Sequence, residues 1–153
     1  MTSAPVLTMP KVEDSLVLET DASDSAIGAV LLVRASDGLE KPAAYLSRSL
    51  TSAERNYSAT EREALAVVWA TKQTRPYLER KSFVVRTDHV ALRWMFSTAT
   101  ENPRVCRWRL ALAEFHFVVE HRPGRSHVAP DSLSRLPARA PVAPDVELEP
   151  PVL

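Results

Sequence analysis

Four acidic residues stand where they could act together on a metal ion. Asp21 and Asp88 each end a short apolar run that contains β-branched residues. Glu63 lies near the start of an apolar helical segment, and Asp131 opens a later one. Each acid alone has an ordinary structural explanation, as a turn residue, a helix cap or a partner of the helix dipole. Together they predict a carboxylate cluster, provided that the two apolar runs are neighbouring strands.

Such a cluster indicates a particular chemistry. Crowded carboxylates are costly unless cations neutralise them. Mg²⁺ prefers oxygen ligands and usually combines one or two carboxylates with the phosphates of a substrate. Two such ions, about 3.5–4 Å apart, can activate a water and stabilise the leaving oxygen of a phosphodiester. Metal-dependent phosphodiester hydrolysis is therefore the first hypothesis for this chain.

The elements that must position these acids follow from the apolar pattern. Three short strands with tight connections predict an antiparallel meander. A long buried helix and a fourth strand follow, and a parallel, right-handed crossover is the expected connection. The predicted strands are Leu16–Asp21, Gly28–Arg34, Pro42–Ser47, Ser82–Asp88 and Phe115–Arg122, and the predicted helices are Ser58–Arg75, Val90–Phe96, Pro103–Glu114 and Asp131–Leu136.

The first predicted helix carries its own start and stop signals. Ser58 and Glu61 have the spacing of a capping box, and Pro76 is expected to end the helix. Its segment Ala64–Ala70 is apolar on nearly all sides, which predicts burial. Cys106 falls in an apolar-periodic segment and is expected in the core. The tryptophans are also expected to be core residues rather than base-stacking platforms, and they are Trp69, Trp94 and Trp108.

Length and composition predict one ordinary globular domain. The chain has 153 residues, of which 45% are apolar and 25% charged. Its longest apolar run, 26–33, is far shorter than the roughly 20 residues that span a bilayer. We expect a lead-in at 1–14, a domain at 15–136 and a disordered, proline-rich tail at 137–153. The absence of a secretory signal and the single cysteine predict an intracellular protein, cytoplasmic or nuclear.

The zero net charge hides an uneven distribution. Residues 1–71 carry 6 basic and 10 acidic side chains, whereas residues 72–125 carry 11 basic and 5 acidic ones. A nuclease with carboxylates for cations and arginines for phosphates would show this asymmetry. A mixed, solvated surface would show it as well, so both interpretations stay open.

Four segments resemble the ribonuclease H domain of Ty3/gypsy-type retrotransposon reverse transcriptases, and the resemblance runs from about Thr2 to Pro137. It implies a ribonuclease H-like α/β fold, with a mixed five-stranded sheet and helices on both faces. It also implies a nuclease that uses two Mg²⁺ or Mn²⁺ ions to cut the RNA strand of an RNA–DNA hybrid. The expected partner is the polymerase domain of the same polyprotein. The segments are Thr20–Ser23, Tyr57–Ala66, Arg86–His89 and His121–Gly124 with Asp131–Arg135.

The resemblance assigns roles to individual residues. The four metal-binding, catalytic acids fall on Asp21, Glu63, Asp88 and Asp131. Glu63 is preferred to Glu61 because the capping box already uses Glu61. Either His121 or His127 is a candidate for the histidine that assists turnover in many ribonucleases H. Candidate phosphate contacts, each of which could instead belong to a solvated helix face, are Arg104, Arg107, Arg109, Arg122 and Arg125.

Two departures from the family pattern support a second hypothesis. The family usually has asparagine where this chain has His127, and alanine where it has Pro130. A proline directly before Asp131 lacks an N–H donor and could displace that acid. The alternative is therefore a non-catalytic, ribonuclease H-like module that binds hybrid or bridges neighbouring polyprotein domains.

The sequence lacks the residues that three other activities associated with such domains require. Asp21 is followed by alanine and serine, so the glycine that an aspartic protease needs beside its catalytic aspartate is missing. The chain holds neither a polymerase Tyr-x-Asp-Asp site nor a His/Cys zinc cluster. The resemblance already includes the first residues, so we expect a fragment of a longer polyprotein or a decayed element.

Overall fold

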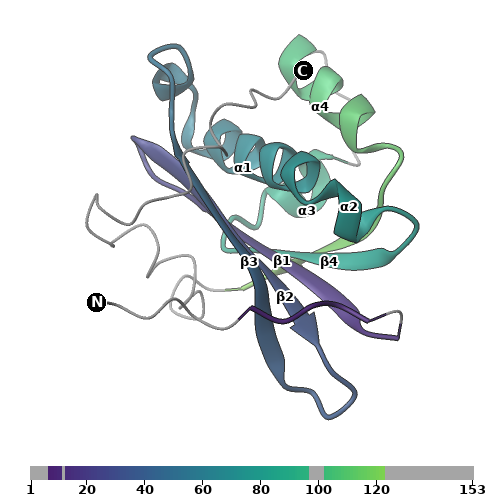
Figure 1. The fold of residues 1–153 in the computed structure, drawn as a ribbon. Coiled ribbons are helices and arrows are strands. Elements are labelled where there is room, and N and C mark those ends of the chain that lie inside the picture. The colour runs from purple at the N-terminus through teal and green to yellow at the C-terminus, as the bar shows by residue number, and fades with distance from the viewer. Residues whose placement is uncertain (1–6, 12, 97–101, 123–153) are drawn as a thin grey trace, which may run out of the picture.

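A mixed five-stranded sheet forms the centre of the molecule (Figure 1). The computed structural model describes residues 7–11, 13–96 and 102–122. In the strand order β3-β2-β1-β4-β5, the first three strands pair antiparallel, and β4 and β5 run parallel to β1. The predicted sheet is confirmed. The strands are β1 (Ser15–Ala22), β2 (Ala26–Arg34), β3 (Glu40–Ser49), β4 (Ser82–Thr87) and β5 (His116–His121).

The central strand β1 is buried on both faces. Leu16 and Leu18 point into the main core, which the helices cover, and Val17 belongs to a smaller apolar cluster. Successive residues of a strand face opposite sides, so this smaller cluster lies on the other face of the sheet. A strand buried on both faces can place a side chain precisely at its end, because its backbone has little freedom to shift.

Helix α1 (Ala59–Gln73) begins as its sequence predicts. The Glu61 N–H donates to Ser58 Oγ over 3.1 Å, and the Ser58 N–H donates to Glu61 Oε1 over 3.0 Å, which completes the capping box. The helix is buried continuously from Glu63 to Thr71. The predicted end was wrong by two residues, because Pro76 lies in the first turn of a second helix, α2 (Arg75–Leu78). A proline fits there since its missing N–H has no helical partner.

Two further helices lie on the same face of the sheet as α1. They are α3 (Leu92–Met95) and α4 (Pro103–Leu112), and both contribute to the main core (Figure 1). The Asn102 side chain caps α4 by accepting from the Arg104 and Val105 N–H groups. The predicted helix 131–136 and tail 137–153 lie outside the described residues. Trp69 and Trp108 are core residues as predicted, whereas the Trp94 side chain is not described.

The edge strand β3 is partly protected by the chain before β1. The Thr8 N–H donates to the Pro42 carbonyl over 2.8 Å, so this part of the predicted lead-in lies along β3. Pro42 itself has no N–H to offer a further strand, and prolines are accepted at sheet edges for this reason. Among the helices of the described residues, none is long and apolar enough to cross a membrane.

Candidate active site

Asp21 and Asp88 come together because their strands are parallel neighbours. β1 pairs with β4 in parallel through Glu19, which lies opposite Arg86. Asp21 and Asp88 each follow that pair by two residues, at the point where their strands end. Carboxyl ends of parallel strands meet at the same edge of a sheet. The predicted strand arrangement therefore brings both acids to one edge.

Glu63 reaches the same edge from the first turns of α1. The Ala22 N–H, which directly follows Asp21, donates to Glu63 Oε1 over 3.2 Å. The residue is only 3% exposed, and within the part of the chain that the structure describes its buried Oε2 atom has no hydrogen-bond partner. Burial raises the pKa of Glu63 to about 9, and the negative charges of Asp21 and Asp88 add to this effect. Three of the four predicted acids thus share one electrostatic environment.

His89 joins the cluster, although it was not among the predicted site residues. One donor atom each of Glu63, Asp88 and His89 lies within 4.8 Å of the other two. His89 Nε2 is 4.0 Å from Glu63 Oε1. The available signal was its position directly after Asp88, in the segment Arg86–His89. A single strand-ending histidine does not reveal that its ring turns back toward a helix.

These donors suit a divalent cation. The Asp88 Oδ1 atom, like Glu63 Oε2, is buried and has no hydrogen-bond partner in residues 7–11, 13–96 and 102–122. A buried carboxylate oxygen without a donor is expensive, and a bound cation removes that cost. Oxygen donors favour Mg²⁺ and Mn²⁺, and an imidazole favours transition metals over Mg²⁺. The residues present therefore fit a metal site.

The end of β5 fixes the backbone around Asp88. His121 Nε2 lies 3.1 Å from the Asp88 carbonyl oxygen, at hydrogen-bond distance. The Arg122 N–H donates to the Thr87 carbonyl over 2.7 Å. His121 and Arg122, both predicted site residues, are thus next to the acidic edge. Both are accessible from solvent, with His121 the more exposed.

The predicted arginines of α4 occupy different environments. Arg104 pairs with Glu61 over 3.1 Å and lies over the Tyr57 ring at 3.9 Å. Arg109 donates through Nε to the Phe96 carbonyl, and Arg107 is exposed. Three other predicted site residues lie outside the described residues, and they are Asp131, His127 and Arg125.

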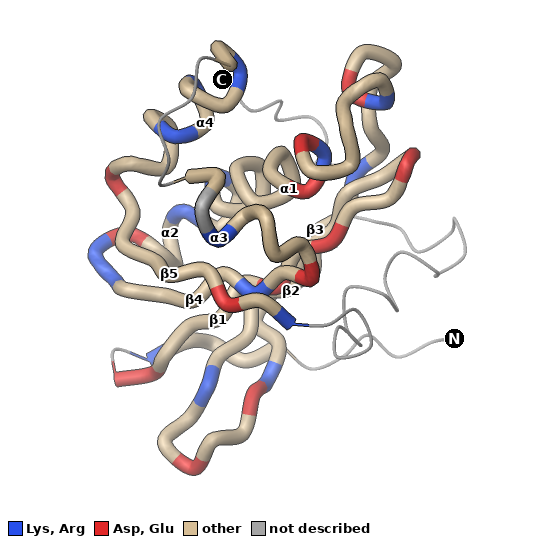
Figure 2. The backbone as a smooth tube through the Cα atoms, turned by 180° about the vertical axis from the view of Figure 1, so that it is seen from behind, with Lys and Arg blue, Asp and Glu red and all other residues tan. Residues whose placement is uncertain are grey.

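The charge asymmetry of the sequence is partly neutralised inside the protein. Arg86, from the basic segment, pairs with Glu19 and Glu40 from the acidic segment, and Arg104 pairs with Glu61 in the same way. Acidic and basic positions are interspersed along much of the chain (Figure 2). The counts of charged residues therefore do not by themselves indicate a nucleic-acid surface.

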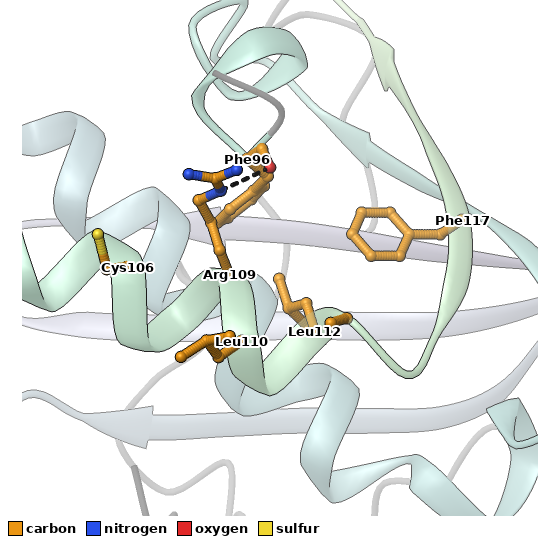
Figure 3. Close-up of a pocket in the computed structure, with 7 residues that line it drawn as sticks. Phe96, Cys106, Arg109, Leu110, Leu112 and Phe117 are labelled. Atoms are coloured by element: carbon orange, nitrogen blue, oxygen red, sulfur yellow. Dashed lines mark hydrogen bonds between the residues drawn. The ribbon is translucent and has the colours of Figure 1, made fainter. Parts of the chain in front are cut away.

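A separate hollow between α4, the end of α3 and β5 is lined mainly by apolar side chains, which offer few groups for catalysis. Phe96, Leu112 and Phe117 line it, together with Arg109, which is tied to the Phe96 carbonyl (Figure 3). Cys106 lines it too and is partly exposed. The prediction that Cys106 belongs to the core was wrong, because the buried stripe of α4 runs through Val105, Trp108 and Leu112.

A family profile and a curated relative both relate this chain to reverse transcriptases and retrovirus-like polyproteins. A family profile described as "RNase H-like domain found in reverse transcriptase" matches residues 11–115. The chain is 41% identical over 132 residues to the retrovirus-related Pol polyprotein from transposon 297 of Drosophila melanogaster. That match covers 86% of this chain and 12% of the polyprotein, so the chain spans about a tenth of this relative's length.

Solved structures share the fold at low sequence identity. A foamy viral protease-reverse transcriptase in complex with RNA/DNA hybrid gives a TM-score of 0.62 at 18% identity, over 86% of this chain and 18% of that one. Ribonuclease H1 from the archaeon Halobacterium salinarum gives 0.58 at 16% identity, over 78% of this chain and 93% of that one. Together these likenesses place the mixed sheet and its helices among ribonuclease H-like folds.

Proposed function

The chain belongs to the family of RNase H-like domains found in reverse transcriptase, and on this premise we propose that it hydrolyses the RNA strand of RNA–DNA hybrids with two divalent ions. More narrowly, we assign it to a Ty3/gypsy-type retrotransposon polyprotein, with the catalytic domain at residues 15–136. The proposed partners are the hybrid and the polymerase domain of the same polyprotein. The proposed location is intracellular.

The observation that carries this proposal is the environment of Glu63. Its carboxyl group is almost fully buried, with the charges of Asp21 and Asp88 beside it. Packing alone gives no reason to place three acids together, because burying carboxylates is costly unless they are paired or bind cations. Such an arrangement is useful where cations are to be bound.

Each residue then has a distinct role. Asp21, Glu63 and Asp88 would hold the ions, with Asp131 expected as the fourth acidic ligand. Bound divalent ions supply an activated water and stabilise charge on the phosphate. The Ala22 N–H holds Glu63 Oε1, and among the described residues Glu63 Oε2 has no hydrogen-bond partner. His121 holds the Asp88 backbone, and Arg122, whose N–H donates to the Thr87 carbonyl, would contact a phosphate of the hybrid.

The test is hydrolysis of a labelled RNA–DNA hybrid with Mg²⁺ or Mn²⁺. Asp21→Asn and Asp88→Asn keep side-chain shape but remove a negative ligand. Loss of several kcal/mol of charge stabilisation corresponds to about a 10³-fold lower cleavage rate. Asp24→Asn is the matched control, because Asp24 is exposed in the turn after β1 and should leave the rate unchanged.

Two results would count against the catalytic proposal. One is a wild-type protein that binds hybrid in the presence of metal but leaves the RNA intact, which is the behaviour of the non-catalytic module. The other is cleavage that survives both Asp21→Asn and Asp88→Asn, since a contaminating nuclease would then be responsible.

A further inference from the structure

The His89 side chain lies close to the carboxyl groups of Glu63 and Asp88. Its ring nitrogen Nε2 lies 4.0 Å from Glu63 Oε1, and the side chain is 30% exposed. A donor atom of Asp88 completes a group of three within 4.8 Å. We propose that His89 is a metal ligand beside Glu63 and Asp88, so that one ion position prefers Mn²⁺ to Mg²⁺. This inference rests on the proposed function, because it concerns the same metal-binding edge.

The separations suit a shared ion better than a direct contact. A hydrogen bond needs donor and acceptor within about 3.2 Å, so 4.0 Å is too long for one between His89 and Glu63. Two ligands bound to the same ion at about 2.1 Å lie no more than about 4.2 Å apart. Only opposite ligands reach that distance, whereas neighbouring ligands of an octahedral ion lie about 3 Å apart. The three donors, which lie within 4.8 Å of one another, would therefore close by about 1–2 Å to share a cation.

Glu63 has a coordination position to offer. Oε1, the oxygen 4.0 Å from His89 Nε2, accepts one hydrogen bond from the Ala22 N–H and keeps a second lone pair for an ion. Among the described residues, neither Glu63 Oε2 nor Asp88 Oδ1 has a hydrogen-bond partner, although both atoms are buried. Native proteins rarely leave buried oxygens unsatisfied, so these two atoms support a cation site in addition to the short distances between the donors.

The backbone on both sides of His89 is held in place. Its N–H donates to Thr87 Oγ1 over 3.1 Å, and its carbonyl accepts from the Leu92 N–H over 3.1 Å at the turn into α3. The His121 ring holds the preceding carbonyl, that of Asp88. These contacts use only backbone atoms of His89 and leave its imidazole for another role. A ligand carried by a fixed backbone is pre-organised for the ion.

Imidazole changes which metals a site prefers. Mg²⁺ favours oxygen ligands in an octahedral shell, whereas first-row transition metals also accept nitrogen donors, and Mn²⁺ is the one among them that shares the carboxylate preference of Mg²⁺. A site with two carboxylates and one imidazole should therefore discriminate between these ions more strongly than a site of carboxylates alone. Removing the imidazole should weaken Mn²⁺ binding and leave Mg²⁺ binding nearly unchanged.

The experiment combines Mn²⁺ electron paramagnetic resonance with calorimetric titration of Mg²⁺. The variants are His89→Asn and the matched control His116→Asn, an exposed histidine at the start of β5. Wild type and His116→Asn should show spin-echo modulation from a coordinated ¹⁴N nucleus. His89→Asn should lose that modulation and bind Mn²⁺ about 10-fold more weakly, with Mg²⁺ affinity within about twofold.

The possible failures are distinguishable. Mn²⁺ that binds wild type without ¹⁴N coupling, or coupling that persists in His89→Asn, overturns the role of His89 and leaves the proposed nuclease intact. Equal losses of Mn²⁺ and Mg²⁺ affinity in His89→Asn overturn the claimed preference. If wild type binds neither ion, with or without RNA–DNA hybrid, both this inference and the proposed function are wrong.

Discussion

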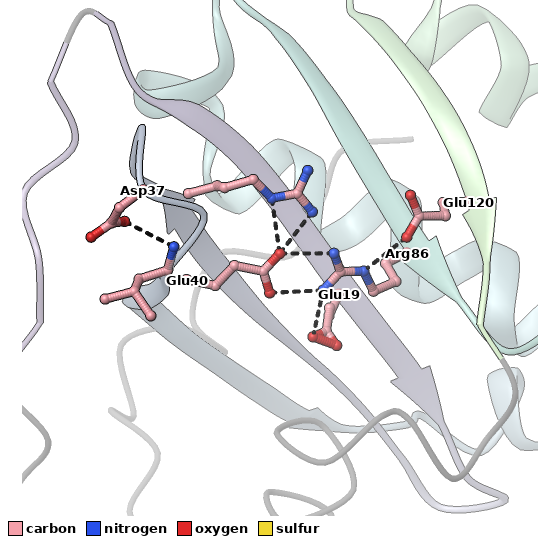
Figure 4. A network of polar contacts seen from close by, with 7 residues as sticks. Glu19, Asp37, Glu40, Arg86 and Glu120 are labelled. Carbon is pink, nitrogen blue, oxygen red and sulfur yellow. Dashed lines mark hydrogen bonds and ion pairs between the residues drawn. The ribbon is translucent and has the colours of Figure 1, made fainter.

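β1 and β4 place buried charge at two neighbouring levels, and the protein treats the two levels in opposite ways. At the first level Glu19 lies opposite Arg86, and this pair is joined by Glu40 and Glu120 (Figure 4). At the second level, two residues further along both strands, Asp21 and Asp88 lie near Glu63. At the first level the Arg86 guanidinium pairs with the acids around it, whereas at the second level three acids lie close together.

The pKa values express this difference. The hydrogen bond from Arg86 lowers the pKa of Glu40 to about 2, although partial burial opposes the shift. Burial raises the pKa of Glu63 to about 9, with Asp21 and Asp88 adding to it. The same two strands thus show that this fold can neutralise a buried acid with its own side chains. Among the described residues no arginine or lysine forms an ion pair with Glu63, which supports a role in ion binding rather than in stability.

Of the substitutions predicted here, replacing Arg86 should lower the free energy of unfolding the most. Arg86 is 3% exposed and donates two hydrogen bonds to Glu40, of 3.0 and 2.9 Å. Arg86→Met leaves Glu19 buried beside an apolar side chain, and breaking a buried ion pair in this way costs about 3–5 kcal/mol. Urea unfolding at pH 7 measures the change.

The matched control is Arg75→Met, which removes an arginine from an exposed ion pair with Glu79 and Glu114. Exposed pairs contribute little, because water screens them. Equal unfolding midpoints for the two variants would mean that the Arg86 level does not stabilise the sheet. That result would contradict the claim that Arg86 stabilises the fold by neutralising buried acids.

The second prediction concerns the acidic level and has the opposite sign. Glu63→Gln removes a buried ionisable group but keeps an acceptor for the Ala22 N–H. In metal-free protein at pH 8 we expect a gain of about 1–3 kcal/mol in unfolding free energy. At the other level Glu19→Gln should lose about 1–2 kcal/mol, because it weakens the contact with Arg86. Urea unfolding in EDTA measures both changes.

The pH dependence of that gain follows from linkage. A raised folded-state pKa stabilises the folded protein below the ordinary value of 4.5, and this stabilisation is lost as the pH rises through about 9. The difference between Glu63→Gln and wild type should therefore grow from pH 5 to pH 8. Saturating Mn²⁺ should reverse it, because ion binding stabilises wild type more. A difference that is constant with pH would contradict the assignment of buried charge to Glu63.

Most strands and helices were predictable because the sequence patterns that indicate them span only a few neighbouring residues. The capping box of Ser58 and Glu61 needs only four residues, and the five strands follow from apolar alternation. A buried helix between two strands requires a parallel crossover, which placed Asp21 and Asp88 at one edge. The short helix α2 was missed because Pro76 is equally compatible with ending one helix and starting another.

The remaining details depend on contacts between distant segments. Arg86 is neutralised by residues of three other strands, and no spacing within one segment reveals such a set. The side-chain direction of His89 depends on the turn into α3, and the partial exposure of Cys106 depends on which face of α4 meets the core. The roles of Asp131 and His127 stay predictions, since both lie outside the described residues.

The third and smallest effect is the acid sensitivity of the neutralised level. A lowered folded-state pKa stabilises the folded protein above the ordinary value of 4.5, and this is lost as the pH falls through about 2. Glu40 is partly exposed, so screening reduces the effect, and Glu40→Gln should cost about 1 kcal/mol at pH 7. The cost should shrink between pH 4.5 and 2, as unfolding midpoints of both proteins across that range would show. Glu79→Gln, in an exposed pair, is the control and should show no such change. If the cost of Glu40→Gln is the same at pH 7 and pH 3, the Arg86 level works through packing rather than charge.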